Sequence, residues 1–474
     1  MTERLKEQRH AITLRVLDRA RQEAQRFLDS LESRPVRAAA SLGELREALG
    51  GDLPEKGTDP VAEIASIAEA MDRGIVASAG PRYFGFVIGG STPATIAADW
   101  LTSVWDQNPG LYATSPAMSV AEETAARWVL ELLGLPATAG LGFVTGCQMA
   151  NFTCLAAARH AVLRRIGWDV EENGLQGAPK VNIVISEEAH VTIHTSLRML
   201  GFGLEGAKVV PTDDEGRMRA DDLQSVLGRL EGPTIVCAQA GNVNSGSFDP
   251  ISEIVEIAHA RGAWVHIDGA FGLWASVVSS RAHLLRGFER ADSWATDAHK
   301  WLNVPYDCGI AIVADRNAQR GAMSVKAAYL EHAENAERDP FEWGPEFSRR
   351  GRGFTVYTAL RTLGRQGVVA MIERNCDQAS RIAKRLGEEK GIEILNDVVL
   401  NQVLVRFEGE NDEAGDQLTR EVIRRVQQEG TCWLGGTVWH GKGAMRISVS
   451  NWSTTDEDID RSADAILRAW REGR

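Results

Sequence analysis

The stretch Asp292-Ser-Trp-Ala-Thr-Asp-Ala-His-Lys-Trp-Leu-Asn-Val-Pro-Tyr-Asp-Cys-Gly309 decides how the rest of the chain is interpreted. A short apolar run at 293–296 predicts a buried strand, and a second run at 309–314 predicts the next one. Between them, the polar residues His299 and Lys300 follow the end of the first strand. A lysine between two core strands is costly to desolvate unless it has a charged partner or has reacted covalently. Lys300 is therefore a candidate for covalent chemistry.

A carboxylate ends another predicted strand upstream. The sequence Trp264-Val-His-Ile-Asp-Gly-Ala-Phe271 places Asp268 at the carboxyl end of a buried run. A lysine amine can hold pyridoxal 5'-phosphate (PLP), and the PLP ring accepts electrons only while an adjacent carboxylate keeps its pyridine nitrogen protonated. Alone, Lys300 would be read as a solvated loop residue and Asp268 as a cap or turn residue. Together, at the ends of two strands, they predict a PLP site.

The composition sets outer limits on the class of protein. The chain has 474 residues, 44% hydrophobic and 25% charged, which predicts a globular protein of two or three domains. A formal charge of −13 argues against binding to nucleic acid or to an anionic membrane. No apolar run approaches the roughly 20 residues of a spanning helix, and the polar start MTERLKEQRH lacks a signal-peptide pattern. Six scattered cysteines, none in a C-x-x-C pair, predict reduced thiols in a cytoplasmic protein.

Three regions are expected along the chain. Apolar residues at helical spacing from Leu5 to Leu31 predict an amphipathic helix, which packs either on its own domain or on a second subunit. We assign residues 1–80 to an N-terminal helical segment that makes a dimer contact, 81–355 to a large PLP-binding α/β domain, and 356–474 to a small C-terminal α+β domain. Within these, the polar stretch 322–353 predicts a loop that is either disordered or functional.

Strand and helix patterns alternate from about residue 90 onward. Uniformly apolar strands joined by helices predict a mainly parallel seven-stranded sheet covered on both faces. The link between the last two strands is too short for a crossover helix, so one of these strands is expected to run antiparallel. The predicted strands are Leu141–Thr145, Val181–Ser186, Ala207–Val210, Thr234–Ala238, Trp264–Asp268, Ser293–Thr296 and Ile310–Ala314.

Residues at the carboxyl ends of these strands form the expected site, because open parallel sheets bind ligands there. The turn Thr145–Asn151 leads into a helix, whose free N–H groups and positive dipole end suit a phosphate. His190 follows another strand and places an imidazole where it could stack on a cofactor ring. His190 and His194 are spaced like metal ligands on a helix. However, the sequence places no third ligand and has no H-E-x-x-H motif, so no metal is expected.

These segments resemble the pyridoxal-dependent group II decarboxylases, which include the aromatic-L-amino-acid, histidine and glutamate decarboxylases. The resemblance covers roughly residues 65–380 well and the C-terminal part more loosely. It implies fold type I, the aspartate-aminotransferase-like α/β fold, with PLP as cofactor, an amino acid as substrate, and a homodimer whose active site lies at the subunit interface. The motifs that carry it are Thr114-Ser-Pro-Ala-Met118, Glu122-Glu123, Thr145-Gly-Cys-Gln-Met-Ala-Asn151, Glu188-Ala-His-Val-Thr192, Gly241-Asn-Val-Asn-Ser-Gly-Ser-Phe-Asp-Pro250, His266-Ile-Asp-Gly-Ala270, Asp297-Ala-His-Lys-Trp301 and Ser348-Arg-Arg-Gly-Arg352.

The resemblance also implies a role for each matched residue. Lys300 would form the Schiff base with PLP, Asp268 would pair with the pyridine nitrogen, and His190 would stack on the ring. The other implied cofactor contacts are Gly146, Cys147 and Gln148 at the phosphate with His299 close by, Ala270 under the ring, and Asn242 near the ring and the substrate carboxylate.

Tyr329 bears on the type of reaction. It aligns with a tyrosine on the mobile loop of the family that protonates the substrate α-carbon after carbon dioxide leaves. Relatives with phenylalanine there are expected to form an aldehyde instead, so Tyr329 favours simple decarboxylation to an amine. The alternatives on this scaffold are an aminotransferase, a carbon–carbon lyase, or a catalytically silent PLP-binding protein.

The sequence departs from the family pattern mainly around the substrate. Aromatic decarboxylases have aromatic and proline residues where this chain has Val87, Ile88 and Gly89. In the aromatic decarboxylases these residues line the pocket for the substrate side chain. The segment that matches a second wall of this pocket is Gln107–Gly110, which is smaller and more polar than in those relatives. An aromatic substrate is therefore a hypothesis. Gln148 also stands where relatives often have serine or threonine, which bears on how the phosphate is held.

Overall fold

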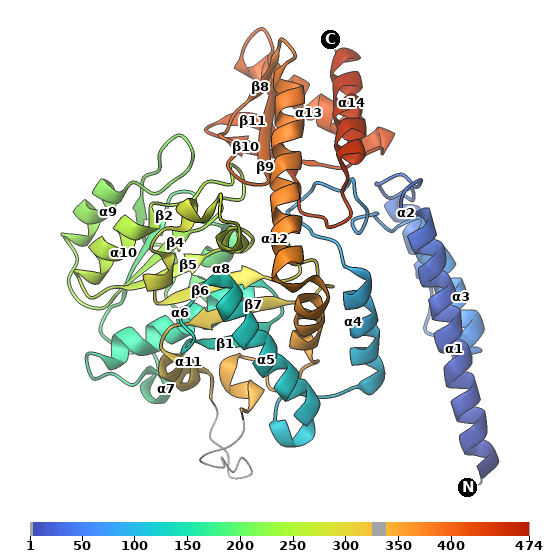
Figure 1. Cartoon of the computed structure of the whole chain (residues 1–474), viewed down its shortest axis with the longest axis horizontal. Coiled ribbons are helices and arrows are strands. Elements are labelled where there is room, and N and C mark those ends of the chain that lie inside the picture. The colour runs from blue at the N-terminus through green and yellow to red at the C-terminus, as the bar shows by residue number, and fades with distance from the viewer. Residues whose placement is uncertain (1–2, 325–337, 474) are drawn as a thin grey trace.

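The computed structural model describes residues 3–324 and 338–473. Its centre is a seven-stranded sheet in the order β1-β7-β6-β5-β4-β2-β3 (Figure 1). The predicted strands were correct in number and place, with ends that differ by at most one residue. They are β1 (Gly140–Val144), β2 (Asn182–Ser186), β3 (Lys208–Val210), β4 (Thr234–Gln239), β5 (Trp264–Asp268), β6 (Ser293–Asp297) and β7 (Gly309–Val313).

Strand direction places the functional segments at one edge of the sheet. The pairs β2–β3, β2–β4, β4–β5 and β5–β6 are parallel. β7 is antiparallel to both β6 and β1, which confirms the expectation for the short link. β1 therefore points the same way as β6, and the carboxyl ends of β1, β2, β5 and β6 meet at the same edge.

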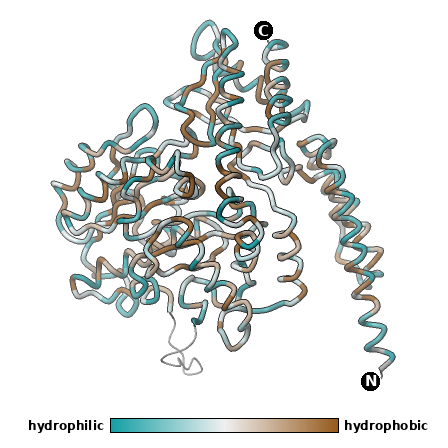
Figure 2. Tube along the Cα trace, viewed as in Figure 1, coloured by the Kyte–Doolittle hydropathy of each residue, from teal (hydrophilic) through white to brown (hydrophobic). Residues whose placement is uncertain are grey.

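Helices cover both faces of the sheet because side chains of alternate strand residues point to opposite faces. One face packs against α5, α9, α10 and α12, and the other against α6, α8 and α11. Hydrophobic residues concentrate in the central strands (Figure 2). The helices around this sheet are α5 (Pro116–Leu133), α6 (Cys147–Arg164), α7 (Val170–Asn173), α8 (Val191–Met199), α9 (Ala220–Leu227), α10 (Ile251–His259) and α11 (Arg316–Met323). Short 3₁₀ helices are η1 (Tyr112–Thr114), η2 (Gly272–Val277), η3 (Ala282–Leu285), η4 (Phe288–Arg290) and η5 (Pro340–Trp343).

Two family motifs that are far apart in the sequence meet in an ion pair. Both side-chain nitrogens Nη1 and Nη2 of Arg349 donate to the Glu122 carboxylate at 2.7 Å, and both side chains are almost fully buried. A two-pronged arginine–carboxylate contact fixes orientation as well as distance. This pair joins α5 to the segment that precedes α12.

The C-terminal part contains a second, antiparallel sheet in the order β10-β11-β9-β8. The apolar runs Val398–Phe407 and Ala444–Val449 predict two of its strands, β9 and β11. The other two were not predicted, because β8 has only three residues and β10 contains two glycines and an exposed valine. The sequence predicts a helix from about Thr355 to Gly364, but the helical segment begins at Arg352 and continues past a kink at Gly364 (φ 61°). A domain boundary at residue 355 falls inside this segment and stays a prediction. The elements are α12 (Arg352–Gly387), β8 (Ile392–Ile394), β9 (Gln402–Phe407), α13 (Asp412–Glu429), β10 (Gly435–Trp439), β11 (Lys442–Ser448) and α14 (Asp456–Arg471).

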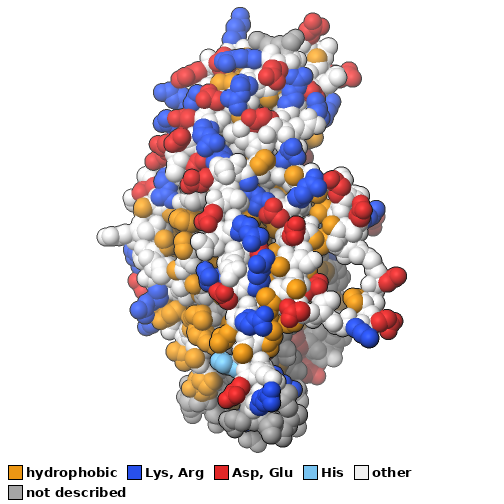
Figure 3. Space-filling model, turned by 90° about the vertical axis from the view of Figure 1, so that its right-hand side faces the viewer, with side chains coloured by type: hydrophobic (Ala, Val, Ile, Leu, Met, Phe, Trp, Pro, Cys, Tyr) orange, Lys and Arg blue, Asp and Glu red, His pale blue; other side chains and the backbone are white. Residues whose placement is uncertain are grey.

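The N-terminal helices form an arm beside the main body (Figure 1). They are α1 (Glu3–Ser30), α2 (Leu42–Leu49) and α3 (Pro60–Asp72), and α1 packs along α3. The next helix, α4 (Pro93–Trp105), packs against α12 of the main body instead. The α1 residues Leu14 and Leu28 stay 52% and 47% exposed, so the apolar stripe is only partly covered by its own chain. Figure 3 faces this side and shows hydrophobic side chains gathered between charged ones. None of the helices in the described part of the chain is long and apolar enough to span a membrane.

Candidate active site

Lys300 lies just beyond the carboxyl end of β6 and is paired with Asp297, the last residue of that strand. Lys300 Nζ is 3.1 Å from Asp297 Oδ2, and the aspartate side chain is 2% exposed. Burial alone would lower the pKa of Lys300, but the Asp297 carboxylate outweighs it, so the pKa is raised above its usual value. The amine is therefore held as an ammonium ion by a buried counterion.

Asp268 ends β5, the strand directly beside β6 in the sheet, and is buried. Its carboxylate accepts a hydrogen bond from Asn151 Nδ2 at 3.3 Å and from the Cys147 thiol at 3.4 Å. Burial and the neighbouring Asp268 carboxylate raise the pKa of Cys147, so the thiol keeps the proton that it donates.

A buried chain of hydrogen bonds fixes the orientation of Asp268. Asn151 Oδ1 lies 2.9 Å from His266 Nε2, and His266 Nδ1 lies 2.9 Å from Ser293 Oγ. Burial lowers the pKa of His266 to about 4, so the ring is neutral at physiological pH. The chain is satisfied when Nε2 carries the hydrogen and donates to Asn151, whose amide then donates to Asp268. Such a supported carboxylate cannot turn away from a ligand in front of it.

The turn between β1 and α6 lies beside this pair. The backbone N–H of Cys147, the first residue of α6, donates to Asp297 Oδ1 at 2.6 Å. A Cβ on Gly146 would lie 3.2 Å from His299 Cε1, and one on Gly309 would lie 2.4 Å from the Gly146 carbonyl carbon. Glycine at both positions therefore lets the Gly146 turn pack tightly against His299 and the Gly309 backbone. The Gln148 side chain, in contrast, is exposed.

His299 is held in one tautomer beside Lys300. The backbone N–H of Cys308 donates to His299 Nδ1 at 3.0 Å, so this nitrogen carries no proton. His299 Nε2 lies 3.3 Å from Asp297 Oδ1, and the Tyr306 ring stacks on the imidazole with centroids 4.1 Å apart. Burial lowers the pKa of His299, which keeps the ring neutral.

His190 begins α8 after β2, and its ring reaches the same site. Its Nδ1 lies 2.8 Å from Thr192 Oγ1, and burial lowers its pKa. The charges of Asp268, Lys300 and Arg446 also influence the pKa of this ring. The structure thus brings together the predicted residues Lys300, Asp268, His190, His299 and Cys147.

For three other predicted residues, the structure does not show the predicted contact. Asn242 is 1% exposed, and its amide is used within its own loop, with Nδ2 donating to Gln239 Oε1 at 3.1 Å. Its contact with ring or substrate stays a prediction. Ala270 follows Asp268, keeps part of its surface exposed and donates its N–H to Asp268 Oδ1 at 3.3 Å. Tyr329 lies outside the described residues, so its role also stays a prediction.

The sequence analysis missed three residues of the site. Asp297 repeats the signal that revealed Asp268, a carboxylate that ends a buried strand, but the strand was ended one residue early. Asn151 belonged to the predicted phosphate turn without a role of its own. Arg446 interrupts the apolar run of β11, and only the fold brings it close to His190.

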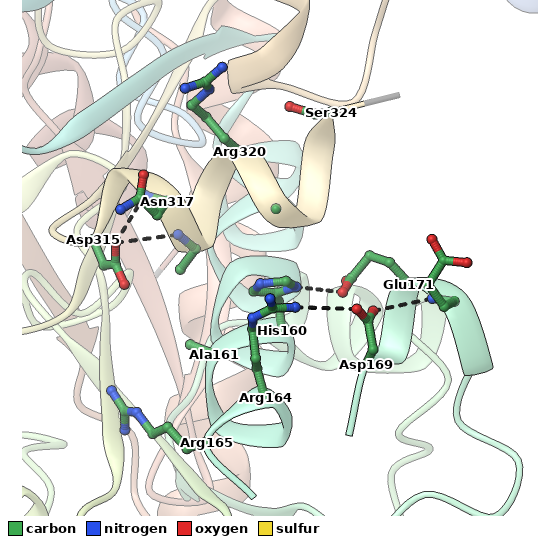
Figure 4. Close-up of a pocket in the computed structure, with 13 residues that line it drawn as sticks. His160, Ala161, Arg164, Arg165, Asp169, Glu171, Asp315, Asn317, Arg320 and Ser324 are labelled. Carbon is green, nitrogen blue, oxygen red and sulfur yellow. Dashed lines mark hydrogen bonds and ion pairs between the residues drawn. The ribbon is translucent and has the colours of Figure 1, made fainter. Parts of the chain in front are cut away.

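A separate pocket of about 830 Å³ lies at the other end of α6 (Figure 4). His160 and Arg164 line it together with Glu171 of the α7 region and Arg320 of α11. His160 stands thirteen residues after Cys147, which corresponds to about 20 Å along a helix. This pocket is therefore distinct from the Lys300 site. Among residues 3–324 and 338–473, no cluster of three or more His, Cys, Asp or Glu side chains is arranged to hold a metal ion.

Comparison with known proteins decides the family. The conserved domain described as "Pyridoxal-dependent decarboxylase conserved domain" matches residues 43–408. The chain belongs to this family. The enzyme is 26% identical to an aromatic-L-amino-acid decarboxylase of Bacillus atrophaeus, over 91% of this chain and 90% of that one. It is 28% identical to an L-2,4-diaminobutyrate decarboxylase of Rhizobium meliloti, over 89% of this chain and 84% of that one.

The fold of the decarboxylase agrees with solved structures. The crystal structure of Oryza sativa TDC with PLP and tryptamine superposes with a TM-score of 0.89 at 24% identity, covering 96% of this chain and 97% of that one. Fold type I is thus confirmed, and the family establishes a PLP-dependent amino-acid decarboxylase. The aminotransferase and carbon–carbon lyase alternatives receive no support from these relatives.

The site of the decarboxylase fits PLP. Lys300 offers an amine, and Asp268 offers a buried carboxylate that faces only weak donors at 3.3–3.4 Å. Gly146 opens the N-terminus of an 18-residue helix, where backbone N–H groups suit a phosphate. These three features match the amine-reactive, ring and phosphate parts of the cofactor.

Proposed function

We propose that this decarboxylase removes the α-carboxylate of an L-amino acid, releasing the amine, by means of Lys300, Asp268, His190 and Tyr329. The proposal rests on the positions of two residues in the sheet. Asp268 is the last residue of β5, and Lys300 lies just beyond the carboxyl end of the adjacent parallel strand β6. A reactive lysine and a ring-protonating carboxylate are thereby held at a fixed separation by the sheet itself.

PLP supplies an aldehyde that condenses with an amine and a ring that accepts the electron pair left when carbon dioxide departs. Asp268, held by Asn151, keeps a proton on the pyridine nitrogen. His190 stays neutral because burial lowers its pKa, so its imidazole would pack against the cofactor ring without adding a second positive charge. Tyr329 donates a proton to the carbon that has lost its carboxylate.

Arg446 supports a binding role for the substrate carboxylate. Its side chain is half-buried, and burial lowers its pKa. Arg446 Nη1 donates to Asn244 Oδ1 at 3.2 Å, and no carboxylate of the described residues forms an ion pair with it. A cation that has no ion-pair partner among the described residues, and whose charge influences the pKa of His190, suits the carboxylate of an amino acid.

We expect Arg446→Met to raise KM for the amino acid by about 10- to 100-fold, because a charge-assisted hydrogen bond is lost. Bound PLP should be unchanged, as judged by visible absorbance. Arg381→Met is the matched control, since Arg381 pairs with Asp460 on the surface of α14. An unchanged KM in Arg446→Met would remove the residue from the substrate site.

We propose an aromatic or large apolar substrate side chain. A Cβ on Gly89 would lie 1.9 Å from the Lys300 carbonyl oxygen, so the segment around residue 89 packs directly against Lys300. In the same segment Phe86 is 60% exposed, with its ring 5.5 Å from that of Trp433. An exposed phenylalanine beside a tryptophan supports an apolar surface for recognition of the substrate. The neighbouring Val87 is buried in the core and does not contribute to that surface.

A panel of L-amino acids tests the reaction and the substrate together. Aromatic, acidic and basic amino acids are incubated with the holoenzyme, and carbon dioxide and amine are quantified. The proposal expects one amine for each carbon dioxide, with aromatic amino acids turned over fastest. Turnover confined to acidic or diamino acids would overturn the aromatic assignment and leave the reaction type intact.

We propose that the enzyme is a homodimer with its site at the subunit interface. The partly uncovered α1 stripe and the exposed Trp100 and Trp105 of α4 support a second copy as the covering surface. Sedimentation equilibrium should therefore give about twice the chain mass of 51.7 kDa. Leu14→Glu with Leu17→Glu should shift the enzyme toward single chains. A wild-type mass of one chain would contradict the proposal.

We also propose a cytoplasmic location. All six cysteines are free and buried, which supports a protein kept in a reducing compartment.

A further inference from the structure

The Asp297 carboxylate joins two parts of the site that the proposed function treats separately. Its Oδ2 is 3.1 Å from Lys300 Nζ, and its Oδ1 accepts the backbone N–H of Cys147 at 2.6 Å. The same Oδ1 lies 3.3 Å from His299 Nε2. The side chain is 2% exposed, so these donors replace the water that a carboxylate otherwise requires.

The Cys147 N–H is also one of the groups expected to hold the cofactor phosphate. It lies at the N-terminus of α6, the positive end of a long helix, directly after Gly146. A phosphate in that place would compete with Asp297 for the same N–H. The two anions would also repel each other strongly, because the site is shielded from water.

Lys300 is subject to the same carboxylate. An ammonium nitrogen has no free electron pair, so Lys300 must lose a proton before it bonds to the aldehyde carbon of PLP, with release of water. The pairing with Asp297 opposes that loss, since it favours the charged amine.

We propose that Asp297 occupies the phosphate position of the cofactor-free enzyme and holds Lys300 in its unreactive charged form. Loading of PLP then requires the carboxylate to give up the Cys147 N–H and the Lys300 ammonium. This inference rests on the proposed phosphate contacts of Gly146 and Cys147. It makes Asp297 a positioning residue that sets cofactor affinity.

Asp297→Asn tests the proposal. The amide oxygen can still accept the Cys147 N–H, while the negative charge is gone. We expect the apparent Kd for PLP to fall by about tenfold, because the repulsion of phosphate and the hold on Lys300 both disappear. The holoenzyme is dialysed against decreasing PLP, and bound cofactor is followed by visible absorbance. Asp297→Ser is a second uncharged variant should the asparagine protein fold poorly.

Asp307→Asn is the matched control. Asp307 lies in the same segment, and its carboxylate accepts from Arg352 Nε at 2.8 Å. Its neutralisation should leave the Kd for PLP unchanged. A similar gain in Asp307→Asn would indicate a general charge effect and overturn the specific role of Asp297.

Inorganic phosphate provides a readout that does not involve Lys300 chemistry. In the PLP-depleted full chain, phosphate should raise the unfolding midpoint of Asp297→Asn more than that of the wild type. PLP bound equally or more weakly by Asp297→Asn would overturn the proposal. Neither binding assay contains an amino acid, so neither depends on catalysis. If the enzyme formed no amine, the proposed function would fail while the role of Asp297 in PLP binding could still be tested.

Discussion

Replacement of Lys300 by arginine is expected to lower amine formation by at least about 10⁴-fold, because a guanidinium keeps the charge but cannot bond to the cofactor aldehyde. The positive charge would still pair with Asp297, so the fold should stay intact. The measurement is the visible absorbance of the purified protein with PLP, together with the initial rate of amine release.

Lys208→Arg serves as the control for this variant, since Lys208 is an exposed residue of the edge strand β3. It should retain both absorbance and activity. If Lys300→Arg kept the absorbance of covalently bound PLP, another lysine would hold the cofactor. The assignment of the stretch at 292–309 would then be wrong.

Tyr329→Phe is expected to lower amine formation by about 10²- to 10⁴-fold, because the proton donor at the former α-carbon is removed. Consumption of the amino acid should continue in part, with an aldehyde as the product. Mass spectrometry of the products separates amine from aldehyde. Cofactor absorbance should match the wild type, since Tyr329 is not assigned to PLP binding.

Tyr357→Phe is the corresponding control. The Tyr357 hydroxyl accepts from Arg361 Nη1 at 3.1 Å on α12, so its loss should leave amine formation unchanged. Full amine formation by Tyr329→Phe would show that another group protonates the product. The alignment of Tyr329 with the loop tyrosine of the family would then carry no mechanistic meaning.

Most of the sheet could be predicted from the sequence because its strands are buried on both faces. Runs such as Trp264–Asp268 are mainly apolar and buried throughout, and this one ends where a polar residue reaches the edge of the sheet. The same logic located Lys300 and Asp268. It also predicted the antiparallel pairing of β6 and β7, because the connecting segment is too short for a helix.

Contacts between distant segments could not be predicted in this way. Arg446 comes from β11, in the second sheet, and no local pattern indicates that its charge acts on His190. Asp297 lies within the quoted stretch, but its second partner, the Cys147 N–H, is 150 residues away in the sequence. Local periodicity carries the secondary structure, whereas the electrostatic partners of a site depend on how the sheet is assembled.

The measurement that tests the central claim most directly is the reaction of the wild-type holoenzyme in deuterated water, with the product amine analysed by mass spectrometry. Decarboxylation followed by protonation at the same carbon predicts an amine that carries one deuterium at the former α-carbon, released together with one carbon dioxide. Keto acids with no release of carbon dioxide would contradict the decarboxylase account, although the PLP fold would stand.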